Sequence, residues 1–219
     1  MPRRLLRNSG GVPFLTLKGN FVIRRGLQPD GDTVHFASSK RYSDPDDITN
    51  VPTDTTGATS KALRLQSIDA PEKSQPFGAD SRNALLKFLG YDVEELGLSD
   101  TDFTADGSPV LVEGWLVTHG LDGNKRPLSY IFREDPGFTH GKRISAEDVL
   151  EVIKESANYR LVARGQVFPA FYENTDEGHA AVFQAAARKA RDNALGVWVI
   201  DDNYFCRSTT TTSAGSGPS

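Results

Sequence analysis

Acidic and basic side chains gather at three places in the chain, where together they could hold a metal ion and a phosphate. The first is Asp30-Gly31-Asp32-Thr33, the second runs from Arg64 to Glu72, and the third runs from Asp122 to Tyr130. Carboxylate and carbonyl oxygens suit a hard cation such as Ca²⁺. A guanidinium donates two parallel hydrogen bonds to a phosphate and stays charged at any working pH. A further carboxylate can take a proton from water. These residue types therefore suffice for phosphodiester hydrolysis.

Each piece also has an ordinary structural interpretation. Asp-Gly in Asp30–Thr33 is typical of a hairpin turn, because glycine tolerates a positive φ. The second piece could be a strand that ends before Pro71, with solvated charges. The third could be a polar turn that leads into a strand, and Phe77-Gly78-Ala79-Asp80 could be a plain helix start. None of the four is specific alone.

The elements that must position these residues shift from strand-like to helix-like along the chain. Gly90, Gly165 and Gly196 follow three of the helical patterns as stop signals. Strands are expected at 21–23, 33–36, 63–68, 110–118 and 128–132, and helices at 79–89, from Ser145 through Ile153, at 158–164 and at 179–195. Five short strands with interspersed helices predict an α+β domain around a small barrel.

The pieces, taken in order, resemble the staphylococcal nuclease (thermonuclease) family. Its pattern is Asp-Gly-Asp-Thr, then Arg-x4-Asp-Thr-Pro-Glu, Tyr-Gly, Asp-x3-Arg-x3-Tyr, Asn-x2-Leu-Val-x2-Gly, and a last helix that ends in Gly/Asn-x-Trp. The matching pieces here are Asp30–Thr33, Arg64–Glu72, Phe77-Gly78, Asp122–Tyr130, Asn158–Gly165 and Leu195–Trp198. The resemblance covers about residues 18 to 202.

The resemblance implies a five-stranded OB-fold β-barrel with three or four packed helices. It divides the chain into a basic N-terminal tail (1–17), the nuclease-like domain (18–205) and a Ser/Thr/Gly-rich tail (206–219). The acidic segments 41–60 and 91–108, and residues 133–155, become loop insertions, which surface loops tolerate.

The resemblance also implies a calcium site. Asp32 and Asp69 match the two carboxylate ligands of Ca²⁺ in the family. Ala70 stands where the family has Thr, whose backbone carbonyl reaches the metal, and alanine keeps that carbonyl.

The remaining roles follow from the same motifs. Arg64 and Arg126 match the two arginines that grip the scissile phosphate, and Glu72 matches the glutamate that serves as general base or orients the attacking water. Five residues separate Arg64 from Asp69, so an ideal strand would point them to opposite faces; they converge only if the strand bends or ends.

The chain departs from the family in three places. Gly123-Asn124-Lys125 replaces a frequent Lys-Tyr-Gly, and Pro127 biases Arg126 towards an extended backbone. A tyrosine that contacts the terminal phosphate in the family is replaced near Phe171-Tyr172.

Composition sets broader bounds. The net charge is −4, but segments 41–60 and 91–108 carry −3 and −6, which leaves +5 on the remainder and permits a polyanionic substrate. The single Cys206 excludes an internal disulfide and a multi-cysteine metal site. The four histidines match no metal-ligand spacing, Gly141-Lys142-Arg143 lacks the features of a phosphate loop, and Trp115 and Trp198 are expected in the core.

We therefore expect a monomeric, calcium-dependent nuclease that acts on single-stranded or unpaired DNA or RNA. With no apolar stretch long enough to span a bilayer, we expect no membrane contact. The absence of a signal-type h-region favours the cytoplasm, but members of the family are often exported, so the compartment stays open. Two alternatives remain. One is a catalytically weak nucleic-acid-binding or scaffold module on the same barrel. The other is an OB barrel for small molecules or proteins, in which the arginine–carboxylate cluster is a structural ion-pair network.

Overall fold

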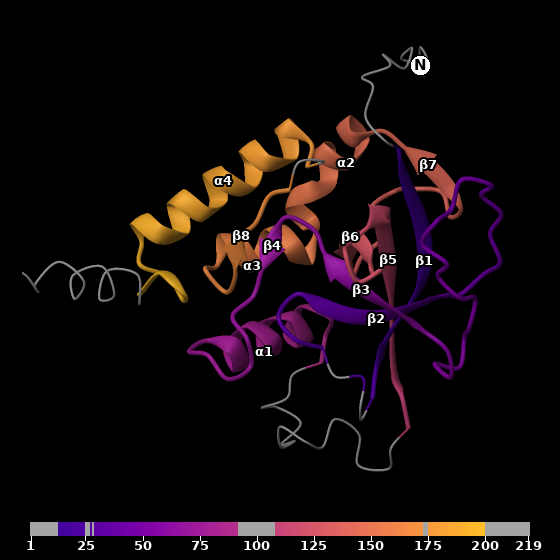
Figure 1. The fold of residues 1–219 in the computed structure, drawn as a ribbon, viewed down its shortest axis with the longest axis horizontal. Coiled ribbons are helices and arrows are strands. Elements are labelled where there is room, and N and C mark those ends of the chain that lie inside the picture. The colour runs from indigo at the N-terminus through magenta and orange to yellow at the C-terminus, as the bar shows by residue number, and fades with distance from the viewer. Residues whose placement is uncertain (1–12, 25–26, 28, 92–107, 173–174, 200–219) are drawn as a thin grey trace, which may run out of the picture.

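A closed β-barrel forms the centre of the protein. The computed structural model describes residues 13–24, 27, 29–91, 108–172 and 175–199. The barrel strands are β1 (Phe14–Ile23), β2 (Thr33–Ser38), β3 (Lys61–Leu65), β5 (Val110–Leu121) and β6 (Pro127–Phe132). They follow the order β2-β3-β6-β5-β1, and pairing of β1 with β2 closes the ring. Only β3 and β6 pair in parallel. This arrangement confirms the α+β class and the five-stranded, OB-like barrel (Figure 1).

Strand β1 makes the closure possible because it pairs with three neighbours. It runs antiparallel to β5 along its length, to β2 near its end and to β7 (Lys142–Ile144) near its start. Gly19 lies opposite Gly114 in the β1–β5 ladder. A Cβ on Gly19 would collide with the carbonyl oxygen of Ala37 on β2, and one on Gly114 would lie 2.5 Å from the carbonyl oxygen of Phe132. The missing side chains therefore let the strands coil tightly.

The barrel interior is the hydrophobic core. Alternate strand residues point inward, as the period of two requires. Large inward side chains that are fully buried include Leu17, Phe21, Phe36, Leu63, Leu65 and Ile131, whereas Tyr130 points to the other face and packs on Phe183 of the last helix. Phe21 and Phe36 pack ring against ring at 5.2 Å across the β1–β2 seam. Trp115, 5% exposed, belongs to this core as expected.

The helices lie together on one side of the barrel (Figure 1). Their bounds are α1 (Gly78–Phe88), α2 (Ala146–Val152), the 3₁₀ turn η1 (Ile153–Glu155), α3 (Ala157–Ala163) and α4 (Glu177–Asp192). The two-stranded ladder of β4 (Ile68–Asp69) and β8 (Phe168–Pro169) lies between α1 and α4. Ser145 caps α2 in a capping box with Asp148, and Phe183, Ala186 and Ala190 form the buried stripe of α4. None of the described helices is both long enough and apolar enough to cross a bilayer.

Three expectations need correction. β1 begins at Phe14, so the expected domain start at residue 18 is too late, because residues 14–17 are buried and paired in the sheet. The strand expected over 63–68 is two strands, β3 and β4, separated by a turn. The last helix ends at Asp192 rather than Leu195. The expected tail 206–219, with Cys206, and most of the acidic segment 91–108 lie outside the described residues.

Candidate functional site

The turn Asp30–Thr33 places the buried carboxylate of Asp32 directly before the first residue of β2. Asp32 is only 3% exposed, and its Oδ2 accepts a hydrogen bond from the backbone N–H of Ala70 at 3.0 Å. Gly31 allows this approach, because a Cβ there would lie 2.5 Å from the Cβ of Ala70 and 2.7 Å from that of Ser81 on α1. The glycine therefore serves close packing, and its φ is not positive as the hairpin interpretation assumed.

Arg64 bridges the two carboxylates that the sequence assigned to a metal. Its Nη1 lies 2.5 Å from Oδ1 of Asp32, and its Nη2 lies 2.6 Å from Oδ1 of Asp69. Arg64 comes from β3, Asp32 from the turn just before β2 and Asp69 from β4. Thr33 and Arg64 are register partners in the β2–β3 ladder, which fixes the first pair. The three side chains therefore form one charged cluster at the end of the barrel.

Burial and charge act in opposite directions on this cluster. Burial raises the pKa of Asp32 to about 6, although the N–H of Ala70 and the charge of Arg64 both lower it. Burial alone would lower the pKa of Arg64, but the carboxylates of Asp32 and Asp69 outweigh that effect and raise it. Asp69 is exposed, so the cluster has one buried edge and one edge open to solvent.

Arg126 is held beside the same cluster by two side chains. Its Nε donates to Oδ2 of Asp122 at 2.8 Å, and its backbone N–H donates to Oδ1 of that carboxylate at 2.8 Å. Its Nη1 donates to Oγ1 of Thr33 at 3.1 Å, and this hydroxyl donates in turn to Oδ1 of Asp32 at 3.2 Å. Burial alone would raise the pKa of Asp122, but hydrogen bonds from Arg126 and Asn124 and the charge of Arg126 outweigh it and lower the pKa. The orientation of Arg126 is therefore fixed before any ligand arrives.

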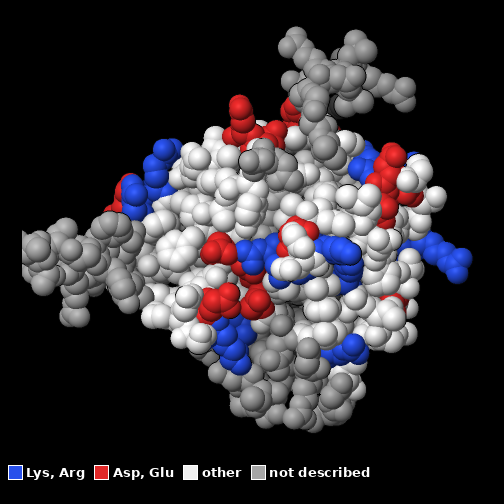
Figure 2. Space-filling model, in the orientation of Figure 1, with Lys and Arg blue, Asp and Glu red and all other residues white. Residues whose placement is uncertain are grey.

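A pocket of about 470 Å³ opens between the two arginines. Arg64, Arg126, Asp122 and Tyr172 line it together with residues of the β5–β6 turn. In Figure 2, basic and acidic side chains lie next to one another near the centre of the face that carries β4 and the start of β2. Such a hollow has room for a phosphate and part of a nucleotide, and two guanidinium groups on its wall favour an anion.

Glu72 stands apart from the cluster. It follows Asp69 by three residues, in an exposed turn that folds back on the start of α1. Its backbone N–H donates to Oε1 of Gln75 at 2.8 Å, and the N–H of Gln75 donates back to the carbonyl of Glu72 at 2.8 Å. Among the described residues its carboxylate has no partner. The structure therefore brings together Arg64, Asp32 and Asp69, and the Thr33 hydroxyl links Arg126 to them. The Glu72 carboxylate is exposed to solvent and makes no contact with this cluster.

The donor set fits a hard cation only in part. Asp32 and Asp69 converge on one guanidinium, so their carboxylates face a common point, and the backbone carbonyl of Ala70 is the remaining protein oxygen assigned there. The described residues contain no group of three or more His, Cys, Asp or Glu side chains that could hold a metal. Two carboxylates and a carbonyl are oxygen ligands suited to Ca²⁺, which takes six to eight. Water and substrate oxygens would complete the shell.

Three residues of the site carried no assigned role in the sequence. Thr33 and Asp122 belong to recognised motifs, yet only the fold shows that both bind Arg126. The i, i+4 spacing of Asp122 and Arg126 is a signal that could have suggested their ion pair. Tyr172, half exposed on the pocket wall, follows β8; the resemblance pointed to Phe171-Tyr172 only as the stretch where a phosphate-contacting tyrosine of the family is replaced.

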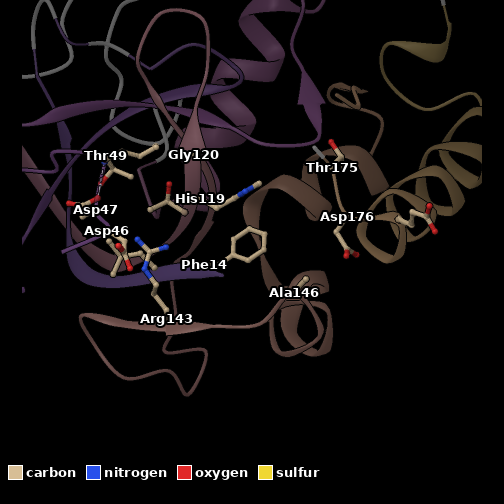
Figure 3. Close-up of a pocket in the computed structure, with 14 residues that line it drawn as sticks. Phe14, Asp46, Asp47, Thr49, His119, Gly120, Arg143, Ala146, Thr175 and Asp176 are labelled. Carbon is tan, nitrogen blue, oxygen red and sulfur yellow. Dashed lines mark hydrogen bonds between the residues drawn. The ribbon is translucent and has the colours of Figure 1, made fainter. Parts of the chain in front are cut away.

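Another hollow, of about 490 Å³, lies away from the arginines. Phe14 and His119 lie in its middle, between Asp46, Asp47 and Arg143 on one side and Asp176 on the other (Figure 3). Arg143 is already paired with Asp44 at 2.7 Å. The surplus of carboxylates makes this hollow unsuited to a polyanion.

The histidines are structural, as expected. Nε2 of His119 contacts Oε1 of Gln66 at 2.8 Å, and His179 bonds the hydroxyl of Tyr130 and the carbonyl of Ala146. His35 bonds Ser60, and Nδ1 of His140 accepts from the N–H of Lys18.

No protein-family model matches the chain, and no curated protein sequence matches it. Function must therefore be argued from the motifs and from the geometry of the cluster around Arg64.

Proposed function

We propose that the protein is a calcium-dependent nuclease of the staphylococcal nuclease type that hydrolyses phosphodiester bonds of DNA, RNA or both. The observation that carries this proposal is the bridge from Arg64 to Asp32 and Asp69, next to a pocket whose wall also holds Arg126. The residues proposed to bind the cation and those proposed to bind the phosphate therefore lie at one end of the barrel. The six motif pieces quoted above supply independent support.

The two arginines would hold the scissile phosphate. Attack by water adds negative charge to the equatorial oxygens, and each guanidinium can donate paired hydrogen bonds to them. Asp122 and Thr33 fix Arg126 in place, so little reorganisation is needed when charge develops. Arg64 already pairs with the carboxylates of Asp32 and Asp69, so some of its N–H groups would have to donate to the phosphate instead.

Glu72 would accept the proton of the attacking water. The water oxygen would form a bond to phosphorus while the bond from phosphorus to the leaving oxygen breaks. The water proton would pass to the carboxylate, and the departing alkoxide would take a proton from solvent. The free carboxylate of Glu72 suits this task because no described cation neutralises it. Asp32, Asp69 and the Ala70 carbonyl would hold a Ca²⁺ ion, which supplies charge neutralisation when bound.

Unpaired strands are the preferred substrate of this proposal. The two arginines bind the phosphate backbone through full charges, and this binding does not depend on which base the strand carries. Tyr172 offers a ring on which an unstacked base can lie.

The decisive experiment measures cleavage of a fluorescent single-stranded oligonucleotide with Ca²⁺ and with EGTA. Wild type should cleave only with Ca²⁺. Glu72→Gln and Arg126→Ala should each lose at least about 10³-fold in rate, as transition-state contacts do in phosphoryl transfer. Glu134→Gln is the matched control, because Glu134 is an equally exposed acid in a turn away from the cluster. Equal rates for wild type and either site variant, with circular dichroism unchanged, refute the assigned role.

A catalytically weak binding module is the second candidate. The observation in its favour is that Arg64 already satisfies two carboxylates, as in a structural ion-pair network. This candidate predicts oligonucleotide binding that is indifferent to EGTA and no cleavage by wild type.

A further inference from the structure

A smaller hollow, of about 240 Å³, lies between α4, β8 and the segment that follows α4. Gln184, Ala187, Arg188 and Arg191 occupy one face of the helix, at helical spacings of three and four, and Trp198 and Pro169 form the opposite wall. Nothing in the proposed hydrolysis uses these residues.

Three side chains of this hollow have hydrogen-bond donors without partners among the described residues. Arg188 and Arg191 are exposed, and within the described part of the chain neither has an ion-pair partner. Among the described residues, the buried Nε1 of Trp198 also lacks a hydrogen-bond partner. A buried N–H without a partner costs free energy, which a bound acceptor would recover. Two guanidinium groups and an indole therefore favour an anion that carries a flat apolar group.

The hollow is close to the proposed catalytic cluster. In the β4–β8 ladder, Asp69 is the register partner of Phe168, and Pro169 is the partner of Ile68. The ring of Phe168 meets the indole of Trp198 edge-on, with centroids 5.2 Å apart. One side chain, Phe168, thus lies between Asp69 and Trp198.

We propose that the hollow lined by Arg188, Arg191 and Trp198 is a second subsite for the single-stranded nucleic acid, which holds a phosphate and a base a few nucleotides from the scissile bond. The inference rests on the proposed function, since the same strand would pass both places. Arginine pairs and an aromatic face are the usual means of binding an unpaired strand without reading its sequence.

The spacing sets the length of strand that the two places share. A cross-strand pair with about 5 Å between Cβ atoms, plus the ring contact, gives a path on the order of 10–15 Å from Asp69 to the hollow. A stacked strand rises about 3.4 Å per phosphate, so the path corresponds to at most roughly three or four nucleotides and to fewer in a more extended strand. A dinucleotide at the cluster should not reach the hollow, whereas an octanucleotide should.

The test measures binding of fluorescein-labelled dT2 and dT8 in EDTA, so that neither a cation nor hydrolysis is required. Arg188→Ala/Arg191→Ala should weaken dT8 binding about 5- to 10-fold and leave dT2 binding unchanged. The slope of log K against log salt should fall by about 0.7, because the hollow holds one phosphate and each phosphate contact on a single strand contributes about 0.7. Lys142→Ala/Lys154→Ala removes two exposed positive charges elsewhere and should match wild type.

Tryptophan fluorescence provides an independent measurement. Trp115 is buried in the barrel, so quenching by dT8 should come from Trp198 and disappear in Trp198→Phe. Equal dT8 affinity and salt slope in wild type and the double arginine variant would overturn the inference. Quenching that persists in Trp198→Phe would do the same. Calcium-dependent cleavage, assayed separately, could survive either result, so the two proposals fail independently.

Discussion

Nη2 of Arg64 and Oδ1 of Asp69 lie 2.6 Å apart although an ideal strand would point these side chains to opposite faces. The strand ends between them: β3 stops at Leu65, the N–H of Gln66 donates to the carbonyl of Ser129, and Ser67 adopts a φ of 64°. The left-handed residue interrupts the alternation of faces before β4 begins at Ile68. The geometry of the cluster thus depends on one turn.

Gly31→Ala should damage the site through packing. The added Cβ would overlap Ala70 and Ser81, whose Cβ atoms would lie 2.5 and 2.7 Å away. Overpacking of this kind costs about 1–3 kcal/mol, and here it would also displace Asp32 from the N–H of Ala70. Urea unfolding measures the loss. Gly123→Ala is the control for stability, because nothing lies within 4 Å of a Cβ at that position. Equal unfolding free energies in the two variants would rule out the packing role.

Thr33→Val should slow cleavage without unfolding the barrel. The hydroxyl of Thr33 links Oδ1 of Asp32 to Nη1 of Arg126, and valine keeps the shape and strand propensity of threonine but not these bonds. We expect kcat/KM to fall roughly 10-fold and stability to change by no more than about 1 kcal/mol. Thr33→Ser restores the hydroxyl and should recover most of the rate. A serine variant as slow as the valine variant would show that the hydroxyl is not what matters.

Calcium should stabilise the fold weakly. Two carboxylates are a low ligand charge, for which dissociation constants of about 10⁻⁴–10⁻³ M are typical. At tenfold excess over such a constant, mass action adds about 1.4 kcal/mol. Thermal unfolding with and without Ca²⁺ measures the gain, which Asp69→Asn should lose and Glu134→Gln should keep. A gain of equal size in Asp69→Asn would place the ion elsewhere.

Acid should destabilise the protein through His119. Burial, together with the smaller effect of the charge of nearby His179, lowers the pKa of this residue from 6.5 to about 4. Because the unfolded chain takes up a proton near pH 6.5 and the folded chain only near pH 4, this contribution to stability is complete above pH 6.5. It falls between those values by at most about 1.4 kcal/mol per pH unit. The unfolding free energy measured from pH 7 to pH 4 should therefore decline more steeply in wild type than in His119→Gln. Parallel curves would assign the acid sensitivity to other groups.

Much of the fold follows from local patterns. Short apolar runs, helical spacing of apolar residues and glycine stops predicted the α+β class, the four α-helices of the described structure and at least part of each barrel strand. These signals depend on neighbours a few residues away, so the sequence carries them directly. The motifs Asp30–Thr33, Arg64–Glu72 and Asp122–Tyr130 likewise name the charged residues of the site.

Only the tertiary structure decided how these pieces meet. Strand register and loop path determine that β1 starts at Phe14 and that Thr33 bridges Asp32 to Arg126. They also determine that the Glu72 carboxylate has no partner among the described residues, and that Arg188 and Arg191 share a hollow with Trp198. A shift of one residue in register would turn each strand side chain to the other face. Contacts between residues tens of positions apart are therefore set by closure of the barrel and not by any local pattern.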